Sequence, residues 1–235
     1  MSWLTDLYES FYNAIVPEQR YLAYLSGLEM TLLISLFAVF IGILIGIIVA
    51  VIKVAARGSK NPVLRVLAGI CNAYTTIIRG TPAMLQVLII YNLVFTSPNV
   101  SRIVVGAVCF GINSGAYVAE IFRAGLESIP KGQMEAGRSL GLNYIQTTRI
   151  IILPQAIKNI LPSLGNELIT MVKETSVISV IAVNDLMKMA QYIGSRTWDI
   201  IPPLVIAGLI YLIITLILTY FQKKLERRLA RSDRH

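Results

Sequence analysis

The chain has little charge and few of the residues from which catalytic or metal centres are usually built. Only 14% of its 235 residues are charged, against roughly 25% in ordinary globular domains. It has one histidine, the terminal His235, and two cysteines, Cys71 and Cys109, which lie in apolar stretches without metal-ligand spacing. We therefore expect two unpaired packing thiols, no catalytic triad and no metal site.

Sequence patterns that bind nucleotides or nucleic acids are also missing. No Gly-x-x-x-x-Gly-Lys-Ser/Thr motif occurs, so we expect no cofactor in this chain and no ATP hydrolysis by the chain alone. The net charge of +8 is compatible with nucleic-acid binding. However, the basic residues flank apolar runs and have few aromatic residues between them, which argues against a nucleic-acid partner.

Apolar sequence, by contrast, is abundant. Hydrophobic residues make up 55% of the chain, and the mean hydropathy is +0.68, which is typical of an integral membrane protein. Five apolar runs can be read along the chain, and the last two are each near the ~20 residues that a helix needs to cross a bilayer. The five runs cover about 28–52, 62–96, 102–124, 160–183 and 202–222. We therefore predict an all-α integral membrane protein with five transmembrane helices.

Two of these runs contain sequences with a structural meaning of their own. In the first run, Gly42 and Gly46 form a small-xxx-small face that suits close helix packing. The second run is interrupted by the helix-breaking sequence Arg79-Gly80-Thr81-Pro82. This pattern fits either an amphipathic helix followed by a spanning helix, or a kinked pair of helices.

Lysine and arginine gather on one side of the predicted bundle. They are concentrated between the first two runs, in the segment of about 127–158, and in the basic tail 223–235. By the positive-inside rule these segments are cytoplasmic and the N-terminus is outside, which is the parity that five crossings give. The membrane domain is predicted over 21–222.

The first twenty residues differ from a cleaved signal peptide, because they lack a basic n-region and contain acidic residues. Apolar and aromatic residues recur there at helical spacing: Trp3, Leu4, Leu7, Tyr8, Phe11 and Tyr12. We predict that segment 1–20 forms an amphipathic helix that lies on the outer face of the membrane. The alternative is a contact for an extracytoplasmic partner.

Polar residues inside the third and fourth runs need an explanation, because a charge there costs ~2.5–3.5 kcal/mol on insertion scales. One interpretation is ion pairing, in which Glu120 meets Arg123 or Arg79. Lys173 would then meet Glu174 or Glu120. We expect pairing for Arg123, Lys173 and Glu174. The other polar residues are expected to line a water-filled pathway: Asn113, Ser114, Glu120, Asn166 and Glu167.

A polar segment rich in glycine and alanine separates the third and fourth runs. It contains Glu135-Ala136-Gly137, then Gly141, then Ile151-x-Leu153-Pro154. Helix formers cover 134–139, Gly141 can supply the positive φ that ends a helix, and Pro154 can open the next one. Its charged residues exclude this segment from hydrocarbon, so we predict a helix–turn–helix docking element.

This spacing resembles the EAA loop of ATP-binding-cassette (ABC) importer permeases, with Gly137 in place of the second alanine. Four segments, 79–82, 116–123, 132–137 and 173–176, occur in the order typical of polar-amino-acid permeases. The resemblance covers roughly 20–222 and implies a type I ABC importer permease fold in a bacterial inner membrane. It also implies partners: a second permease copy, two cytoplasmic ATPase subunits that bind ATP and magnesium, and an extracytoplasmic amino-acid-binding protein.

The same resemblance assigns the EAA loop, about 127–158, to coupling with the ATPase subunits. The expected coupling residues are Glu135, Ala136, Gly137, Arg138, Gly141, Leu153 and Pro154. Since the face formed by Ala136 and Gly137 is nearly free of side chains, we expect a partner groove to approach its backbone closely. Because the chain has a complete loop and a complete polar face, we expect a homodimer.

An amino-acid substrate brings an α-ammonium and an α-carboxylate group. Arg79 is a candidate partner for the carboxylate, and one of Glu120 and Glu167 can pair with the ammonium. The other glutamate stays an unpaired buried carboxylate unless the substrate has a second positive charge. Glu120 can instead hold Arg123, in which case only Glu167 discriminates between basic and neutral amino acids. The expected substrate-binding set is Arg79, Asn113, Ser114, Tyr117, Glu120, Asn166, Glu167 and Thr170.

These groups favour a basic amino acid, with arginine first, then lysine or histidine, and glutamine or glutamate as the alternative. A secondary transporter also fits polar groups in a helix bundle, but it has no need for the docking loop. An intramembrane enzyme fits least, because no nucleophile–base pair can be assembled from these runs. Surfaces for the binding protein are expected at Ser97–Asn99 and at Asp185–Asp199.

Overall fold

The computed structural model describes residues 2–57, 59–95 and 100–231, and every regular element in these ranges is helical. The longer helices are α2 (Arg20–Ala56), α3 (Pro62–Gly80), α5 (Arg102–Glu127), α8 (Leu153–Glu174) and α10 (Ile201–Arg231). The shorter helices are α1 (Ser2–Ile15), α4 (Ala83–Val94), α6 (Lys131–Ser139), α7 (Tyr144–Thr147) and α9 (Leu186–Thr197). Short 3-10 or π-helical turns lie at Pro17–Gln19, Thr148–Ile152 and Thr175–Ile181. The predicted all-α class is confirmed.

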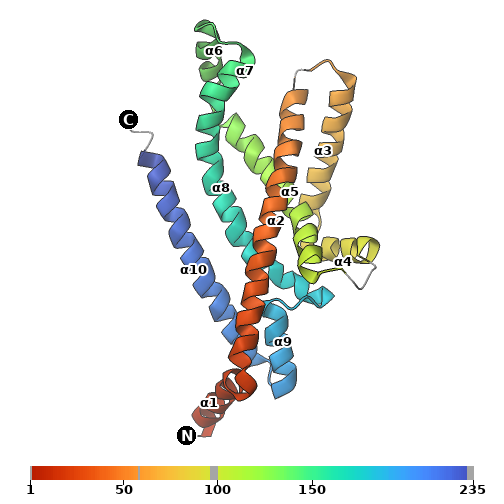
Figure 1. Ribbon diagram of the computed structural model, residues 1–235, viewed down its shortest axis with the longest axis vertical. Coiled ribbons are helices and arrows are strands. Elements are labelled where there is room, and N and C mark those ends of the chain that lie inside the picture. Colours follow the sequence, from red (N-terminus) through yellow and green to blue (C-terminus); the bar gives the residue numbers. More distant parts are fainter. Residues whose placement is uncertain (1, 58, 96–99, 232–235) are drawn as a thin grey trace.

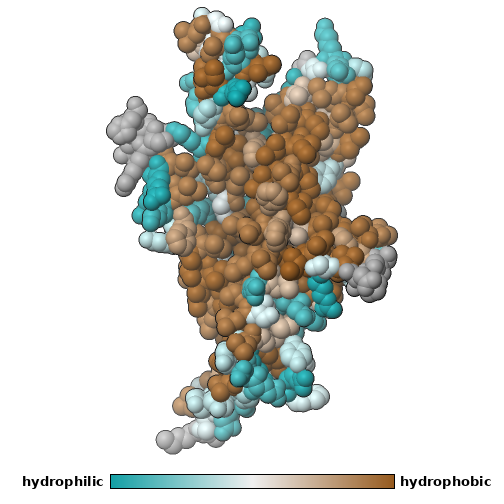
Figure 2. Space-filling view, viewed as in Figure 1, coloured by the Kyte–Doolittle hydropathy of each residue, from teal (hydrophilic) through white to brown (hydrophobic). Residues whose placement is uncertain are grey.

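The molecule is elongated, and α2 runs along its length (Figure 1). One end, called the α1 end, carries α1; the other, called the α6 end, carries α6 and α7. The connection from α2 to α3 and the C-terminal part of α10 lie toward the α6 end, as does the polar loop (Figure 1). An apolar band covers the middle of the surface between two polar ends (Figure 2). The basic segments of the sequence therefore share one end of the molecule.

Three of the described helical stretches are long and apolar enough to cross a membrane, namely Pro17–Ala56, Arg102–Glu127 and Ile201–Leu229. Helices α3 and α4 pass the same test only as a pair, and they are bent by 115° at the break between them. The kinked-pair interpretation of 62–96 is thus the one that the structure adopts. Helix α8 covers much of the run predicted at 160–183, but it ends at Glu174 and a 3-10 turn follows. The number of five crossings stays a prediction.

The bend between α3 and α4 is held by one side chain that the sequence analysis did not single out. Gln86 of α4 donates from Nε2 to the carbonyl oxygen of Ile78 at 2.7 Å and to that of Thr81 at 3.0 Å. The same amide group lies 2.8 Å from the hydroxyl of Thr81. Carbonyl groups at a helix end have no partner within the helix. Gln86 supplies that partner and fixes the angle at which α4 leaves α3.

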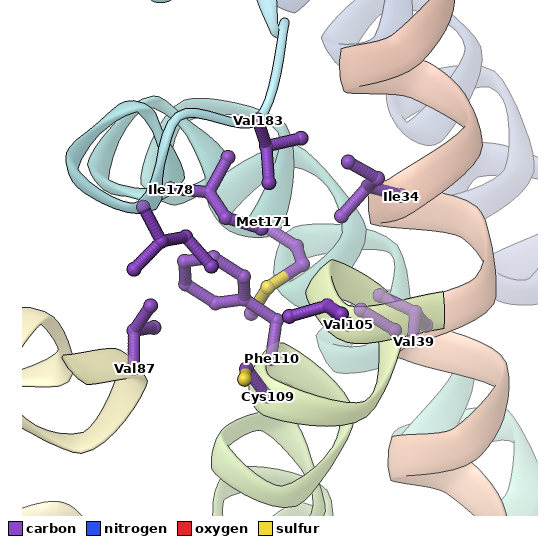
Figure 3. Packing of buried hydrophobic residues seen from close by; sticks show 11 residues of the cluster. Ile34, Val39, Val87, Val105, Cys109, Phe110, Met171, Ile178 and Val183 are labelled. Carbon is purple, nitrogen blue, oxygen red and sulfur yellow. The ribbon is translucent and has the colours of Figure 1, made fainter. Parts of the chain in front are cut away.

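Helices α2 and α5 pack closely at the predicted small-residue face. A Cβ atom built on Gly42 would lie 2.7 Å from Oγ of Ser114, and one built on Gly46 would lie 2.5 Å from Cγ1 of Val118. Larger side chains would therefore force the two helices apart. The main core lies where α2, α5 and α8 converge, around Phe110 and Met171 (Figure 3). Both cysteines are free and buried, as expected for packing thiols.

Segment 185–199 contains a helix, α9, that the sequence analysis did not predict. Asp185 caps it by accepting from the backbone N–H of Lys188 at 2.9 Å. Leu186 and Ile193 are buried against Tyr24 of α2 and Ala207 of α10. One face of this segment is therefore part of the core, and only the other face is available as a surface. The turn expected at Ser97–Asn99 lies outside the described residues.

The α1 end exposes both tryptophans of the chain. Helix α1 confirms the predicted N-terminal helix, and it leaves Trp3 66% and Tyr8 68% exposed. Trp198 follows α9 in the left-handed backbone region with φ 56°, and its side chain is 96% exposed. Helix α1 packs on both α9 and α10, so these aromatic residues belong to one end of the fold. Such residues are typical of the boundary between membrane and water.

Candidate functional site

A cleft of about 400 Å3 opens between α3, α5 and α8. Four residues of the predicted substrate-binding set line it: Arg79, Tyr117, Glu120 and Glu167. Apart from Ile121, the rest of its wall is small or polar and consists of Ala124, Gly125, Ser128, Asn159 and Ser163. The last turn of α3 contributes Arg79, whereas α5 and α8 form the two long walls. The structure thus brings together residues that are up to 88 positions apart in the chain.

Glu167 lies on the α8 wall and is 8% exposed. Its Oε1 atom accepts a hydrogen bond from the hydroxyl of Ser114 on α5, at 2.7 Å. Within the part of the chain that the structure describes, no lysine or arginine comes within ion-pair distance of this carboxylate. A buried carboxylate without a cation is costly in a low-dielectric region. Glu167 is therefore an acceptor whose charge the described residues leave unbalanced.

Asn113 lies one residue before Ser114 and is 4% exposed. Its Nδ2 donates to Oε1 of Gln86 at 2.8 Å, which links the α5 wall to the side chain that holds the α3–α4 bend. Its Oδ1 is buried and has no hydrogen-bond partner among the described residues. Buried polar atoms are rarely left without a partner. This oxygen is thus a second acceptor beside Ser114.

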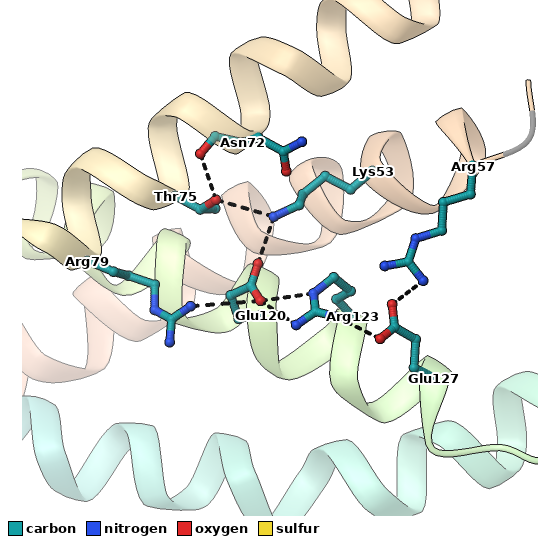
Figure 4. A network of polar contacts seen from close by, with 8 residues as sticks. All are labelled: Lys53, Arg57, Asn72, Thr75, Arg79, Glu120, Arg123 and Glu127. Carbon is teal, nitrogen blue, oxygen red and sulfur yellow. Dashed lines mark hydrogen bonds and ion pairs between the residues drawn. The ribbon is translucent and has the colours of Figure 1, made fainter.

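Glu120 lies in the same cleft, but it is surrounded by cations (Figure 4). Its Oε1 is 2.7 Å from Nζ of Lys53, and its Oε2 is 2.7 Å from a guanidinium nitrogen of Arg123. Arg79 is farther away, at 3.8 Å. The predicted pairing of Glu120 with Arg123 or Arg79 is confirmed for both arginines. The predicted ion pair of Lys173 with Glu174 or Glu120 is not found: within the described residues, Lys173 lies within ion-pair distance of neither carboxylate.

The network continues along α5 through Glu127, which binds Arg123 at 2.6 Å and also forms an ion pair with Arg57 of α2 (Figure 4). Lys53 makes a second contact, a hydrogen bond of 3.2 Å to the hydroxyl of Thr75 on α3. Helices α2, α3 and α5 are thus tied together by charge beside the cleft. The pairing of Lys53 with Glu120 was not predicted from the sequence. The lysines beside predicted loops were used there only to decide which side of the membrane each loop lies on.

Arg79 stands at the mouth of the cleft. Its side chain is 46% exposed, and its guanidinium carbon lies 5.5 Å from the centre of the Tyr117 ring. A cation over an aromatic face is held weakly but in a defined direction. Arg79 therefore keeps donors available for an anionic group that enters the cleft.

Four predicted residues do not line the cleft. Asn113 and Ser114 are buried beside it, whereas Asn166 is exposed and Thr170 is half-buried. Successive residues on a helix point about 100° apart. Asn166 is therefore turned away from the direction of Glu167.

The polar loop forms a compact tip at the α6 end, defined here as residues 131–153. Gly141 has φ +86° and follows α6, and Pro154 lies in the first turn of α8, so both local predictions are confirmed. Asn143 and Gln146 form a capping box at the start of α7. A π-helical turn then joins the tip to α8. Because this joint is helical throughout, α7 and α8 form one continuous element, and α6 packs against it.

The expected role of the Ala136–Gly137 face needs a correction. Gly137 is buried, and a Cβ atom built on it would collide with Thr147 and approach Ile151 to 3.1 Å. The close approach at this glycine is therefore made by the returning chain, not by a partner. Glu135, Ala136, Arg138 and Leu153 remain exposed.

Apolar side chains stand on the surface of the tip and were missed in the sequence. Leu140 is 79% exposed and Ile145 is 75% exposed, with Tyr144 and Ile150 more than half exposed. These residues lie in a polar segment at the α6 end, beyond the apolar band (Figure 2). A cluster of this kind outside the membrane-facing band is typical of a protein contact.

Comparison with known proteins gives a consistent result. The model of the family described as binding-protein-dependent transport system inner membrane component matches residues 42–231. The chain is 38% identical over 227 residues to the arginine transport system permease protein ArtQ of Bacillus subtilis (strain 168), which covers 94% of this chain and 98% of the relative. It is 40% identical over 208 residues to a putative glutamine transport system permease protein, GlnP, of Rickettsia conorii (strain ATCC VR-613 / Malish 7), with coverages of 86% and 91%.

Solved structures share the fold. The crystal structure of an amino acid ABC transporter with histidines superposes with a TM-score of 0.80 at 42% identity, and it covers 88% of this chain and 94% of that chain. An inward-facing structure of the MetNI methionine ABC transporter superposes with a TM-score of 0.77 at 19% identity, with coverages of 91% and 99%. The second likeness concerns the fold alone.

Proposed function

The chain belongs to the family of binding-protein-dependent transport system inner membrane components and is a permease subunit of an amino-acid ABC importer, and we propose that it carries a cationic amino acid, arginine first. Lysine and histidine are the next candidates. The chain supplies the membrane pathway, and partner ATPase subunits supply ATP hydrolysis. The permease named for arginine transport, ArtQ, supports this choice because its likeness extends over nearly the whole chain.

The observation that carries the proposal is the contrast between the cleft carboxylates. Glu120 is already balanced by Lys53 and Arg123, so it does not need a charge from a ligand. Glu167 has a hydroxyl partner and no cation among the described residues. A ligand with a positively charged side chain or ammonium group would remove the cost of that buried charge.

The remaining cleft residues suggest how the substrate is oriented. Arg79 at the mouth is the candidate for the α-carboxylate, because a guanidinium group matches a carboxylate with two parallel hydrogen bonds. Glu167 is then the partner of the cationic end, whereas Asn113, whose Oδ1 is buried without a partner among the described residues, lies outside the cleft lining. Tyr117 orients Arg79 through its ring. Asn166 and Thr170 stay candidates only for a part of the pathway outside the cleft.

Coupling to ATP hydrolysis follows from the continuity of α7 with α8, against which α6 packs. We propose that Glu135, Arg138 and the apolar residues Leu140 and Ile145 contact an ATPase subunit. The exposed cluster at the tip supports this contact. Because Glu167 is on α8, a displacement of the tip shifts the α8 wall against α5 and opens or closes the cleft. Alternating access of this kind is the usual principle of importers.

The proposed assembly is a homodimer in a bacterial inner membrane, with two ATPase subunits at the α6 end and a binding protein at the α1 end. The basic segments at the α6 end support a cytoplasmic position for that end. The proposed path has five crossings, with the bent α3–α4 pair and α8 each counted once. Two different permease chains in equal amounts in the purified complex would disprove the homodimer.

The experiment is uptake by the complex reconstituted in vesicles with its ATPase subunit and binding protein. Glu167→Gln should lower ATP-dependent arginine uptake at least roughly tenfold, since a charge-paired hydrogen bond contributes about 1.5–3 kcal/mol. Glu29→Gln, at an exposed carboxylate of α2, is the control and should retain uptake. Uptake without ATP would instead favour a secondary transporter.

Glutamine is the second candidate, because a putative glutamine permease, GlnP, is about as similar to this chain as ArtQ. A neutral side chain needs no additional carboxylate. If glutamine uptake by the wild type exceeds arginine uptake, and Glu167→Gln lowers both equally, the cationic assignment is wrong.

A further inference from the structure

A second pocket near the α6 end has a different character from the cleft. It has a volume of about 340 Å3, lies between α2 and α3, and is lined by Lys53, Ala56, Arg57, Arg65, Ala68, Gly69 and Asn72. Every charged residue of this lining is basic. The charged side chains that a ligand would meet in this pocket are therefore all positive.

The cations of this pocket are held in place by the chain. Lys53 and Arg57 are anchored from behind by Glu120 and Glu127 of α5 (Figure 4). Arg65 is anchored differently, because its Nε donates to the backbone carbonyl oxygen of Ser59 at 2.9 Å. A carbonyl group carries no net charge, so Arg65 keeps its full positive charge at the pocket. Side chains that are fixed before a ligand arrives lose less entropy when they bind it.

The floor of the pocket is open to a ligand of some size. A Cβ atom built on Gly69 has nothing within 4 Å, and the amide of Asn72 is one helical turn farther along α3. Arg65, Gly69 and Asn72 share one face of α3, since they are spaced by four and three residues. The adjacent face of α3 exposes apolar side chains: Val66, Leu67 and Ile70.

We propose that this pocket binds the phosphate group of an anionic phospholipid, with Arg57 and Arg65 as its charged partners and Asn72 as a hydrogen-bond donor. The headgroup enters beside Gly69, and the acyl chains run along Val66 and Ile70. Basic pockets between membrane helices near the cytoplasmic surface suit lipid headgroups. A free phosphate ester shares the headgroup chemistry, but it would make no use of the apolar face. The inference is independent of which amino acid is transported.

The test is a binding titration on the full-length protein, purified in a neutral detergent alone and with its ATPase subunit. The probe is a fluorescent phosphatidylglycerol, with the matching phosphatidylcholine as the uncharged comparison. Wild-type protein should bind phosphatidylglycerol saturably and more tightly. Arg65→Gln should weaken that binding about fivefold, which corresponds to about 1 kcal/mol for one charge near the membrane surface. Gly69→Leu should abolish the saturable binding without any change of charge.

Two variants serve as matched controls. Lys224→Gln removes an exposed cation from the basic group of α10, and Gly208→Leu adds the same side chain at a helix glycine that is equally open. Both should bind phosphatidylglycerol as the wild type does. An equal loss in Lys224→Gln would mean diffuse charge attraction and would overturn the proposal.

Two further outcomes also overturn it. If glycerol 3-phosphate competes as strongly as the lipid, the site takes a soluble phosphate ester. If the ATPase subunit abolishes lipid binding to the wild type, the pocket is part of a subunit contact. Persistent saturable binding in the complex, lost in Gly69→Leu, supports the lipid site.

Discussion

Glu120 and Glu167 line the same cleft from facing helices, but their surroundings are opposite in kind. Glu120 has Lys53 and Arg123 at 2.7 Å, with Arg79 at 3.8 Å. Glu167 is more deeply buried and accepts one hydrogen bond from the neutral hydroxyl of Ser114. The first carboxylate stabilises the arrangement of α2, α3 and α5. The second leaves an unbalanced charge where a ligand can reach it, so burial alone does not distinguish a structural carboxylate from a binding one.

The largest effect on stability is expected at Glu120. Glu120→Gln leaves Lys53 without its carboxylate partner and Arg123 with Glu127 alone. Removal of one partner from a fully buried pair costs ~3–5 kcal/mol, and we expect about 2–3 kcal/mol here because these side chains are partly exposed. The measurement is the unfolding midpoint of the purified protein in detergent. The double variant with Lys53→Met should recover part of the loss. An unchanged midpoint in Glu120→Gln would show that the network does not stabilise the fold.

A smaller loss of stability is expected when Glu167 loses its hydrogen-bond donor, Ser114. Ser114→Ala removes the hydroxyl and leaves the buried carboxylate without a hydrogen bond, which costs about 1–2 kcal/mol of unfolding free energy. Packing against Gly42 should be preserved, because alanine is smaller than serine. Ser176→Ala is the control, since its exposed hydroxyl donates only to the carbonyl of Lys173. Equal stability of both variants would mean that Glu167 finds another donor.

The same substitution at the two carboxylates should have opposite consequences. Glu167→Gln keeps the shape and the hydrogen bond from Ser114 but removes the unbalanced charge. Its unfolding midpoint should equal or exceed that of the wild type, within about 1 kcal/mol. Arginine uptake should fall in spite of this. If Glu167→Gln is less stable than the wild type, Glu167 stabilises the fold as Glu120 does, which would contradict a role in binding alone.

Arg79 should have the smallest effect on stability. An exposed ion pair contributes roughly 0–1 kcal/mol, and its distance of 3.8 Å from Glu120 is long. Arg79→Gln should nevertheless weaken the competition by unlabelled arginine against labelled arginine in the uptake assay. Competition by agmatine, which is arginine without the carboxylate, should not change. An equal loss for both competitors would contradict a role of Arg79 in binding the carboxylate.

Features with local causes were predictable from the sequence. The positive φ of Gly141 and the position of Pro154 at the start of α8 each depend on one residue type and its immediate neighbours. The kink after Gly80 belongs to the same class. In each case a steric property of glycine or proline selects the conformation, whatever the rest of the fold does.

Features that depend on distant contacts were not predictable in the same way. Lys53 is 67 positions from Glu120, and nothing in its neighbourhood indicates an ion pair across two helices. Gly137 was expected to face a partner, but the covering residue Thr147 comes from a segment that returns only after α6 has ended. Asn166 and Glu167 are adjacent in sequence, and only the packing of α8 against α5 decides which of them faces the cleft.

The exposed positions of Trp3 and Trp198 make the molecule spectroscopically asymmetric. Both indole rings lie at the α1 end, and the tip at the α6 end has none. Intrinsic tryptophan emission of the chain therefore reports on one end alone. Any protein that covers the α1 end should change this emission. An event confined to the tip should leave the emission unchanged, so the unlabelled chain carries its own reporter of which end a partner covers.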